Sequence, residues 1–138
     1  MTEQKNCKER VREHFRNRIS ELEKLWSASK EDSEKSVEGL GTFNEYGLSF
    51  DYVAPGKFKD QKRGYFRYQL SWGGPSDEFR FYCDENLEPV EIEYWFLDWF
   101  DGAHVTLTGK DYALLAEIFG DFKETGTVQA KLDESRNE

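Results

Sequence analysis

Hydrophobic residues recur every three or four positions near the start of the chain. The stripe consists of Cys7, Val11, Phe15, Ile19, Leu22 and Trp26. This spacing is typical of one apolar face of an α-helix with 3.6 residues per turn. It predicts an amphipathic helix over residues 3–26, with Thr2 as its N-cap. Residues 27–36 are polar and contain no aromatic residue, which predicts a linker or a frayed helix end.

From residue 39 onward the period of the pattern changes to two. Apolar and polar side chains alternate in segments 46–53, 65–72, 78–83 and 90–99. A shorter segment with Val105 and Leu107 follows an Asp-Gly hairpin signal. Such alternation is typical of β-strands with one buried face. Most links between the segments are short, and short links join antiparallel strands because parallel strands need a long crossover.

A second helical stripe lies near the C-terminus. It consists of Tyr112, Leu115, Phe119 and Phe122. Thr108 and Asp111 resemble a capping box at its start, and residues 127–138 are polar and expected to be loose.

The order of these segments predicts an α+β fold. It comprises an N-terminal amphipathic helix, a four- to five-stranded antiparallel meander and a C-terminal helix, with the helices over one face of the sheet. A length of 138 residues suits one domain. Within it, residues 1–36 form the helix and linker, and residues 39–126 form the core.

Composition excludes several classes of protein. Aromatic residues make up 16% of the chain, as expected of a packed core rather than a disordered segment. A net charge of −9 disfavours general attraction to nucleic acid or to an anionic membrane surface. The charged N-terminus lacks the apolar stretch of a signal peptide, which predicts a cytoplasmic protein. Two cysteines are too few for a disulfide scaffold or a zinc site.

The charge is unevenly distributed. Residues 77–101 contain nine acidic residues and one basic residue, Arg80, whereas residues 57–67 contain five basic residues and one acid, Asp60. The simpler interpretation is that the two blocks neutralise each other on adjacent strands. The alternative is that the acidic block imitates the phosphates of a nucleic acid and attracts a basic cleft on another protein.

The segment 90–99 contains the most unusual candidate site. Val90, Ile92, Tyr94 and Phe96 form the face expected in the core. The opposite face carries two acids and then turns apolar, in the order Glu91, Glu93, Trp95, Leu97 and Trp99. Exposed tryptophans are typical of binding hot spots, although burial under a helix or loop is the structural alternative.

Signals for catalysis are incomplete. Glu91 and Glu93 share a strand face, but glycoside hydrolases hold their carboxylates across a cleft. His104 is close in sequence to Asp98, yet no serine or cysteine in an elbow motif accompanies the pair. No metal or cofactor motif is present either. The sequence therefore predicts a protein that is not an enzyme and has no cofactor.

The leading functional hypothesis is a non-enzymatic acidic module that binds a basic protein, such as a nucleic-acid-binding protein. Its proposed contact residues are Glu91, Glu93, Trp95, Asp98, Trp99 and Asp101. A first alternative is a small-ligand or carbohydrate-binding module that uses exposed tryptophan on the sheet. A second is a homodimer formed through the first helix.

Three segments carry a family resemblance: 44–52, 71–78 and 94–102. Together they resemble a family of small, uncharacterised acidic proteins of proteobacterial plasmids and integrative elements. The resemblance covers residues 39–126 and leaves the first helix outside. It implies no catalytic residue. It does imply an accessory role for a mobile genetic element, such as inhibition of a host restriction or CRISPR system.

Overall fold

A computed structural model describes residues 6–73, 75–98 and 101–137, and it confirms the predicted α+β fold. The elements are α1 (Cys7–Glu31), α2 (Phe43–Tyr46), β1 (Ser49–Val53), β2 (Tyr65–Ser71), β3 (Ser76–Cys83), β4 (Pro89–Asp98), β5 (Asp101–Thr106), α3 (Gly109–Glu124) and α4 (Thr127–Arg136). The five strands form one antiparallel meander in the order β1-β2-β3-β4-β5.

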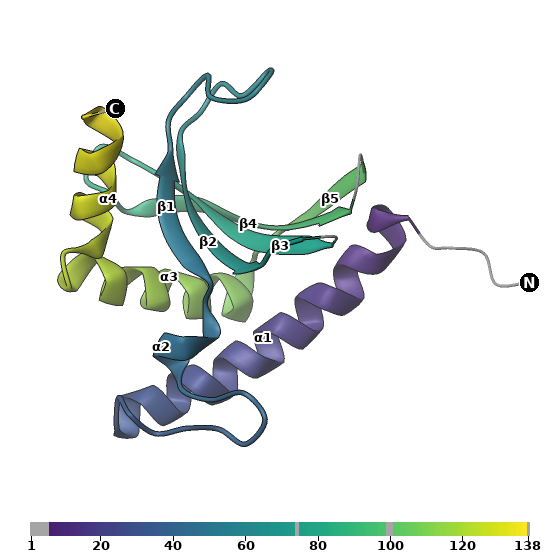
Figure 1. Cartoon of the computed structure of the whole chain (residues 1–138), viewed down its shortest axis with the longest axis vertical. Coiled ribbons are helices and arrows are strands. Elements are labelled where there is room, and N and C mark those ends of the chain that lie inside the picture. Colours follow the sequence, from purple (N-terminus) through teal and green to yellow (C-terminus); the bar gives the residue numbers. More distant parts are fainter. Residues whose placement is uncertain (1–5, 74, 99–100, 138) are drawn as a thin grey trace, which may run out of the picture.

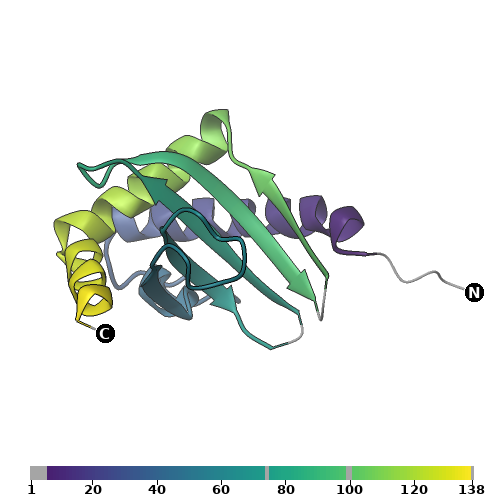
Figure 2. The ribbon, with the colours of Figure 1, turned by 90° about the horizontal axis from the view of Figure 1, so that it is seen from above.

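The helices lie mainly on one side of the sheet. Figure 1 shows α1 and α3 beneath it, while α4 stands beside β1. The loop between β1 and β2, residues 54–64, rises on the opposite side (Figure 1). Figure 2, viewed from above, shows that this loop lies over part of the sheet. The two faces of the sheet are therefore covered in different ways, by helices on one side and by a loop on the other.

Aromatic side chains form the interface between the sheet and the helices. Cross-strand pairs such as Phe66 with Phe81 and Phe79 with Tyr94 stand on the same face of the sheet because side chains alternate along each strand. The ring of Phe119 from α3 lies 5.6 Å from that of Phe66 and 4.9 Å from that of Phe81. All of these residues are essentially fully buried. Burial of rings of this size is the main favourable term in folding.

A buried carboxylate joins α1 to the sheet within this interface. Asp77 on β3 accepts hydrogen bonds from Arg18 Nε at 2.7 Å and Arg18 Nη2 at 3.0 Å. It also accepts from the hydroxyls of Tyr94, at 2.7 Å, and Ser71. Burial alone would raise the pKa of Asp77, but the hydrogen bonds from Arg18, Ser71 and Tyr94 outweigh it and hold that pKa below its usual range. The charged form is thus the stable form in the fold.

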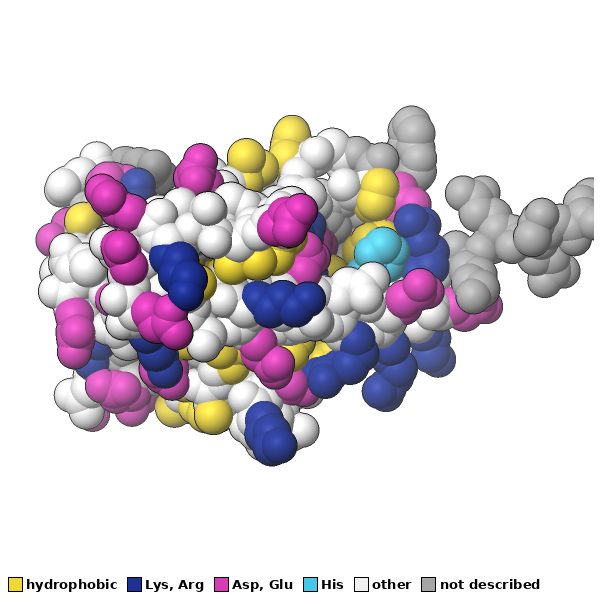
Figure 3. All heavy atoms as spheres, turned by 90° about the horizontal axis from the view of Figure 1, so that it is seen from below, with side chains coloured by type: hydrophobic (Ala, Val, Ile, Leu, Met, Phe, Trp, Pro, Cys, Tyr) yellow, Lys and Arg dark blue, Asp and Glu magenta, His cyan; other side chains and the backbone are white. Residues whose placement is uncertain are grey.

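The first half of α1 is rich in basic residues, and two of them, Arg10 and Arg18, pair with acids of the sheet. Arg10 pairs with Asp98 at 2.6 Å, and the backbone N–H of Cys7 donates to Asp101 at 2.8 Å. This bond holds the pKa of Asp101 below its usual range, and it places a negative charge at the positive end of the helix dipole. Figure 3 shows Lys and Arg side chains gathered near this end of the chain. Asp98 and Asp101 of the acidic block 77–101 thus compensate positive charge in the first half of α1.

Three expectations about the helices need correction. Helix α1 continues to Glu31, so the first part of the segment expected to be a linker or a frayed helix end is regular helix, and Ala28 is buried there. Residues 127–136 form α4 rather than a loose tail, because Val128 is buried in the core. Thr108 precedes α3, but its side chain makes no capping hydrogen bond with a described residue.

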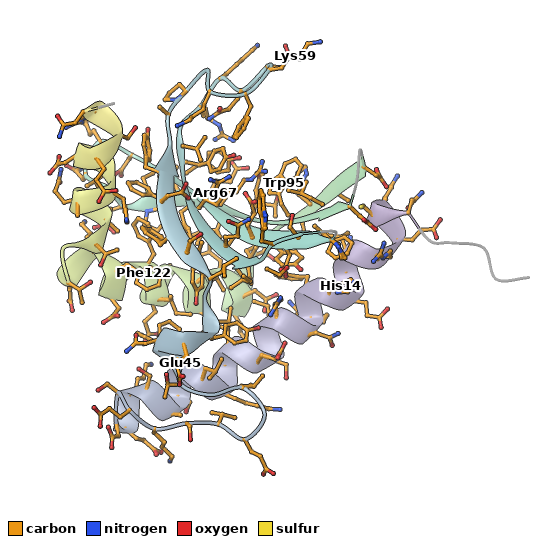
Figure 4. All side chains as sticks on the ribbon, viewed as in Figure 1. His14, Glu45, Lys59, Arg67, Trp95 and Phe122 are labelled. Carbon is orange, nitrogen blue, oxygen red and sulfur yellow. The ribbon has the colours of Figure 1, made fainter. Side chains whose placement is uncertain are left out.

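Two side chains also lie elsewhere than expected. Val90 was expected in the core but is 63% exposed, since it lies near the start of β4, beside a shift in register with β3. The position of His14 on the charged side of the first helix predicts a solvated side chain, yet its ring stacks on Phe96 at 4.3 Å, between α1 and the sheet (Figure 4). A histidine among charged neighbours can still pack by its flat ring.

Substitution of Asp77 by asparagine is expected to lower the free energy of unfolding by about 3 kcal/mol, because it leaves Arg18 without its buried counter-charge. The depressed pKa of Asp77 contributes stability above the unfolded-state pKa of about 4, and this contribution is lost as the pH falls through the folded-state value. The difference between wild type and Asp77→Asn should therefore shrink in acid. Urea unfolding at several pH values measures it.

Asp51→Asn is the matched control. Asp51 also pairs with an arginine, Arg67, at 2.7 Å, but its side chain is 41% exposed. Exposed pairs contribute less than about 1 kcal/mol. Equal losses in the two variants would show that Asp77 does not anchor α1.

Candidate functional site

The face of the sheet turned away from α1 and α3 carries large aromatic and charged side chains. They alternate with the core residues of the same strands, which is why they point to the other side. They are Tyr65 and Arg67 on β2, Glu78, Arg80 and Tyr82 on β3, Glu91, Glu93 and Trp95 on β4, and His104 on β5. We refer to this side as the open face.

The β1–β2 loop encloses a hollow over the open face. Residues 58–63 of the loop and Tyr65, Arg80, Tyr82 and Trp95 of the sheet line a space of about 370 Å³, here named the recess. In Figure 4, Lys59 lies at the far end of the loop and Trp95 points up from the sheet toward the same side. The recess is thus formed by two walls from different parts of the chain.

Local hydrogen bonds give the loop a defined course. The backbone N–H of Gly56 donates to the carbonyl of Gln61, and the side chain of Gln61 accepts from the N–H of Phe58 and donates to the carbonyl of Arg63. The chain passes tightly against β1 at Gly64, where a Cβ atom would lie 2.1 Å from the hydroxyl of Tyr52. A larger residue at position 64 would have to displace the ring of Tyr52.

The floor of the recess is a stack of rings and guanidinium groups. The guanidinium of Arg80 lies 4.7 Å from the ring centre of Tyr65 and 4.1 Å from that of Trp95. Trp95 also stacks with His104 at 4.5 Å, and Arg63 covers Tyr82 at 4.0 Å. Flat cations over ring faces attract the ring quadrupole. The stack therefore closes much of the open face where none of the described helices covers it.

Glu93 fixes the position of the stacked rings through hydrogen bonds. Its Oε1 accepts hydrogen bonds from Tyr82 Oη at 2.8 Å and from Trp95 Nε1 at 2.9 Å, while His104 Nε2 lies 3.5 Å from its Oε2. Glu93 is 7% exposed. Burial, followed by the hydrogen bond to Glu93, raises the pKa of the Tyr82 hydroxyl. The tyrosine is therefore a neutral donor, and both aromatic rings have fixed positions.

The charges around the recess are not all compensated locally. Arg80 donates to Glu78 at 2.8 Å, and Arg63 donates to Glu91 at 2.9 Å. Lys59 and Lys62 are exposed and make no hydrogen bond or ion pair with any described residue. The wall formed by the loop thus presents two uncompensated positive charges beside Asp60.

The structure does not bring the six predicted contact residues together. Glu91, Glu93 and Trp95 lie on the open face, but Asp98 and Asp101 contact α1 through Arg10 and Cys7. Trp99 lies outside the described residues. The expected pair of Asp98 and His104 does not form, because His104 faces Glu93 instead. A role of these residues in binding a partner stays a prediction.

Several residues of the recess were not identified from the sequence. Arg80 and Tyr82 share a strand face with Glu78, and Tyr65 starts the neighbouring strand. The signal was the mixture of aromatic and charged side chains at alternate positions of successive strands, where a solvent-facing surface is usually small and polar. The contribution of Lys59 and Lys62 depends on the path of the loop, which no sequence pattern predicts.

Comparisons of the chain with protein families, with curated proteins and with solved structures give no match. The family resemblance of residues 39–126 therefore stays a prediction. Within the part of the chain that the structure describes, no three His, Cys, Asp or Glu side chains are grouped to hold a metal ion. None of the described helices is long and apolar enough to span a membrane.

Glu93→Gln is expected to disturb the stack. It removes the charged acceptor shared by Tyr82 and Trp95, and loss of a buried, charge-assisted acceptor costs about 2 kcal/mol of unfolding free energy. The indole N–H signal of Trp95 should move in an NMR spectrum. Glu85→Gln is the control, since Glu85 is an exposed acid on the β3–β4 turn. The same unfolding free energy and the same indole signal in both variants would contradict the role given to Glu93.

Proposed function

We propose that the protein is a binding module that takes a small, ring-bearing organic molecule into the recess. The observation that carries this proposal is the fixing of Trp95 and Tyr82 by the buried Glu93 beneath the hollow. Side chains that are already ordered lose little entropy when a ligand stacks on them, and this increases affinity. A volume of about 370 Å³ is within the range of small-molecule sites.

The chemistry of the lining suits a flat or cyclic ligand. Phe58 of the loop, which is 52% exposed, offers a ring face, whereas Trp95 lies between Arg80 and His104 and offers its edge. Sugars and aromatic rings both pack on such faces, and arginines such as Arg80 supply hydrogen bonds at the edges. The proposal therefore covers carbohydrates as well as aromatic compounds.

We propose binding without catalysis. A general base needs a free lone pair directed at the substrate. Glu93 directs one oxygen at Tyr82 and Trp95, and its other oxygen faces His104. Glu78 is 2% exposed and is bonded to Arg80. These contacts support a positioning role for both carboxylates.

The two other hypotheses have less support. An acidic surface for a basic partner needs uncompensated charges, but Glu91 and Asp98 are paired with Arg63 and Arg10. A mobile-element inhibitor that imitates nucleic acid has the same requirement. A dimer through α1 needs its apolar stripe to be available, yet that stripe is buried against the sheet.

Trp95→Ala is expected to weaken ligand binding at least tenfold, a loss of about 1.4 kcal/mol, because it removes one wall of the recess and the ring that holds Arg80 and His104 in place. The measurement is an NMR titration with a panel of glucose, cellobiose, nucleosides and nucleoside monophosphates. At least one compound should produce saturable shifts at recess residues in the wild type.

The control for this experiment is Trp72→Ala. Trp72 is 76% exposed and follows β2, outside the recess. It should leave binding unchanged. The proposal fails if no compound of the panel binds the wild type, or if the two tryptophan variants lose affinity equally.

A further inference from the structure

We infer that the ligand of the recess is an organic anion, a molecule that carries one phosphate or carboxylate group on a flat ring. This inference rests on the proposed binding function and names its ligand class. The ring would lie against Phe58 and the edge of Trp95, and the anionic group would lie against the loop, at Lys59 and Lys62. Of the six residues predicted from the sequence, only Trp95 would contact the ligand.

The recess has two kinds of cation, arginines that are paired with acids and lysines that are not. Arg63 and Arg80 are paired with Glu91 and Glu78, so their charges are compensated. Lys59 and Lys62 have no such partner among the described residues, although the protein as a whole carries a net charge of −9. Two uncompensated cations beside a hollow in an acidic protein attract an anion at that place.

Aromatic side chains from the loop and from the sheet also line the recess. Phe58 is exposed on the loop and Trp95 is half-buried on the sheet, and both line the recess. A large apolar side chain exposed at the rim of a hollow is typical of a ligand site. Figure 4 shows the loop and Trp95 on the same side of the sheet. A flat ring on Phe58 would leave its substituent near the lysines of the same loop.

The charges around the recess favour a ligand with one anionic group. Glu91 and Asp60 lie at or next to the recess, and most of the remaining surface charge is negative. A nucleic acid needs several phosphate contacts to bind, each supplied by a cation. The recess supplies two uncompensated lysines within a space of about 370 Å³. These quantities fit a small anion better than a polymer.

The experiment compares ligands that differ only in the anionic group. The probes are adenosine monophosphate with adenosine, uridine monophosphate with uridine, and benzyl phosphate with benzyl alcohol. We expect each phosphate to bind at least tenfold more tightly than its neutral partner, measured from shifts of the Trp95 indole and the loop amides. Raising the salt concentration should weaken only the phosphates, because screening acts on the charge.

Two double variants with the same change in charge locate the effect. Lys59→Gln with Lys62→Gln should abolish the tenfold advantage of the phosphates. Lys8→Gln with Lys24→Gln should keep it, because these exposed lysines lie on α1, on the other side of the sheet. Both doubles should retain the unfolding free energy of the wild type within about 0.5 kcal/mol.

The possible results of these titrations distinguish a failure of the anion inference from a failure of the proposed binding function. If the neutral partners bind as tightly as the phosphates, the anion inference is wrong and the proposed binding function stands. The inference is also wrong if inorganic phosphate binds as tightly as adenosine monophosphate, or if a ten-nucleotide thymidine strand binds more tightly than any monophosphate. If none of the probes and none of the sugars binds the wild type, the proposed function itself is wrong.

Discussion

A sheet has two faces, and the helices of this protein cover one of them. Helices α1 and α3 bury the phenylalanine-rich face, while the other face is left to its own side chains and to the β1–β2 loop. Large side chains on such a face must pack against one another and provide one another with hydrogen-bond partners. The stack of Tyr65, Arg80 and Trp95 over the buried Glu93 does this through ring contacts and hydrogen bonds. The same requirement that closes the face also gives the recess an ordered floor.

The acidity of the protein has a structural explanation in much of the block 77–101. Asp77 and Asp98 pair with arginines of α1, Asp101 lies at the N-terminus of that helix, and Glu91 pairs with Arg63 of the loop. These contacts connect elements that are far apart in sequence. They also account for Arg10 and Arg18 in the first half of α1 and for Arg63 in the loop. The two charge blocks thus neutralise each other at Arg63 and Glu91, although from a loop and a strand rather than from adjacent strands, while α1 supplies partners for Asp77, Asp98 and Asp101.

The strand alternation and the two helical stripes were sufficient to predict the α+β fold, because both periods follow from which side chains are buried. The site was harder to predict. Trp95 and Glu93 were identified, yet Tyr65, Arg80 and Tyr82 alternate with core residues just as ordinary outward positions do. Their importance depends on cross-strand neighbours and on a loop that folds back over them. Asp98 and Asp101 were grouped with them because they are near in sequence, although they contact a different side of the molecule.

By itself, the sequence determined the five strands, their antiparallel order, helices α1 and α3, and the concentration of acid and tryptophan around β4, whereas α2 and α4 were not predicted. Local periodicity and short turns are sufficient for these features. The tertiary structure alone decided which charges are compensated. It paired Arg18 with Asp77 across 59 positions and Arg63 with Glu91 across 28, and it left Lys59 and Lys62 over the ring stack. Whether two charges compensate each other depends on the distance between them in space. The spacing of charged residues along the sequence does not give that distance.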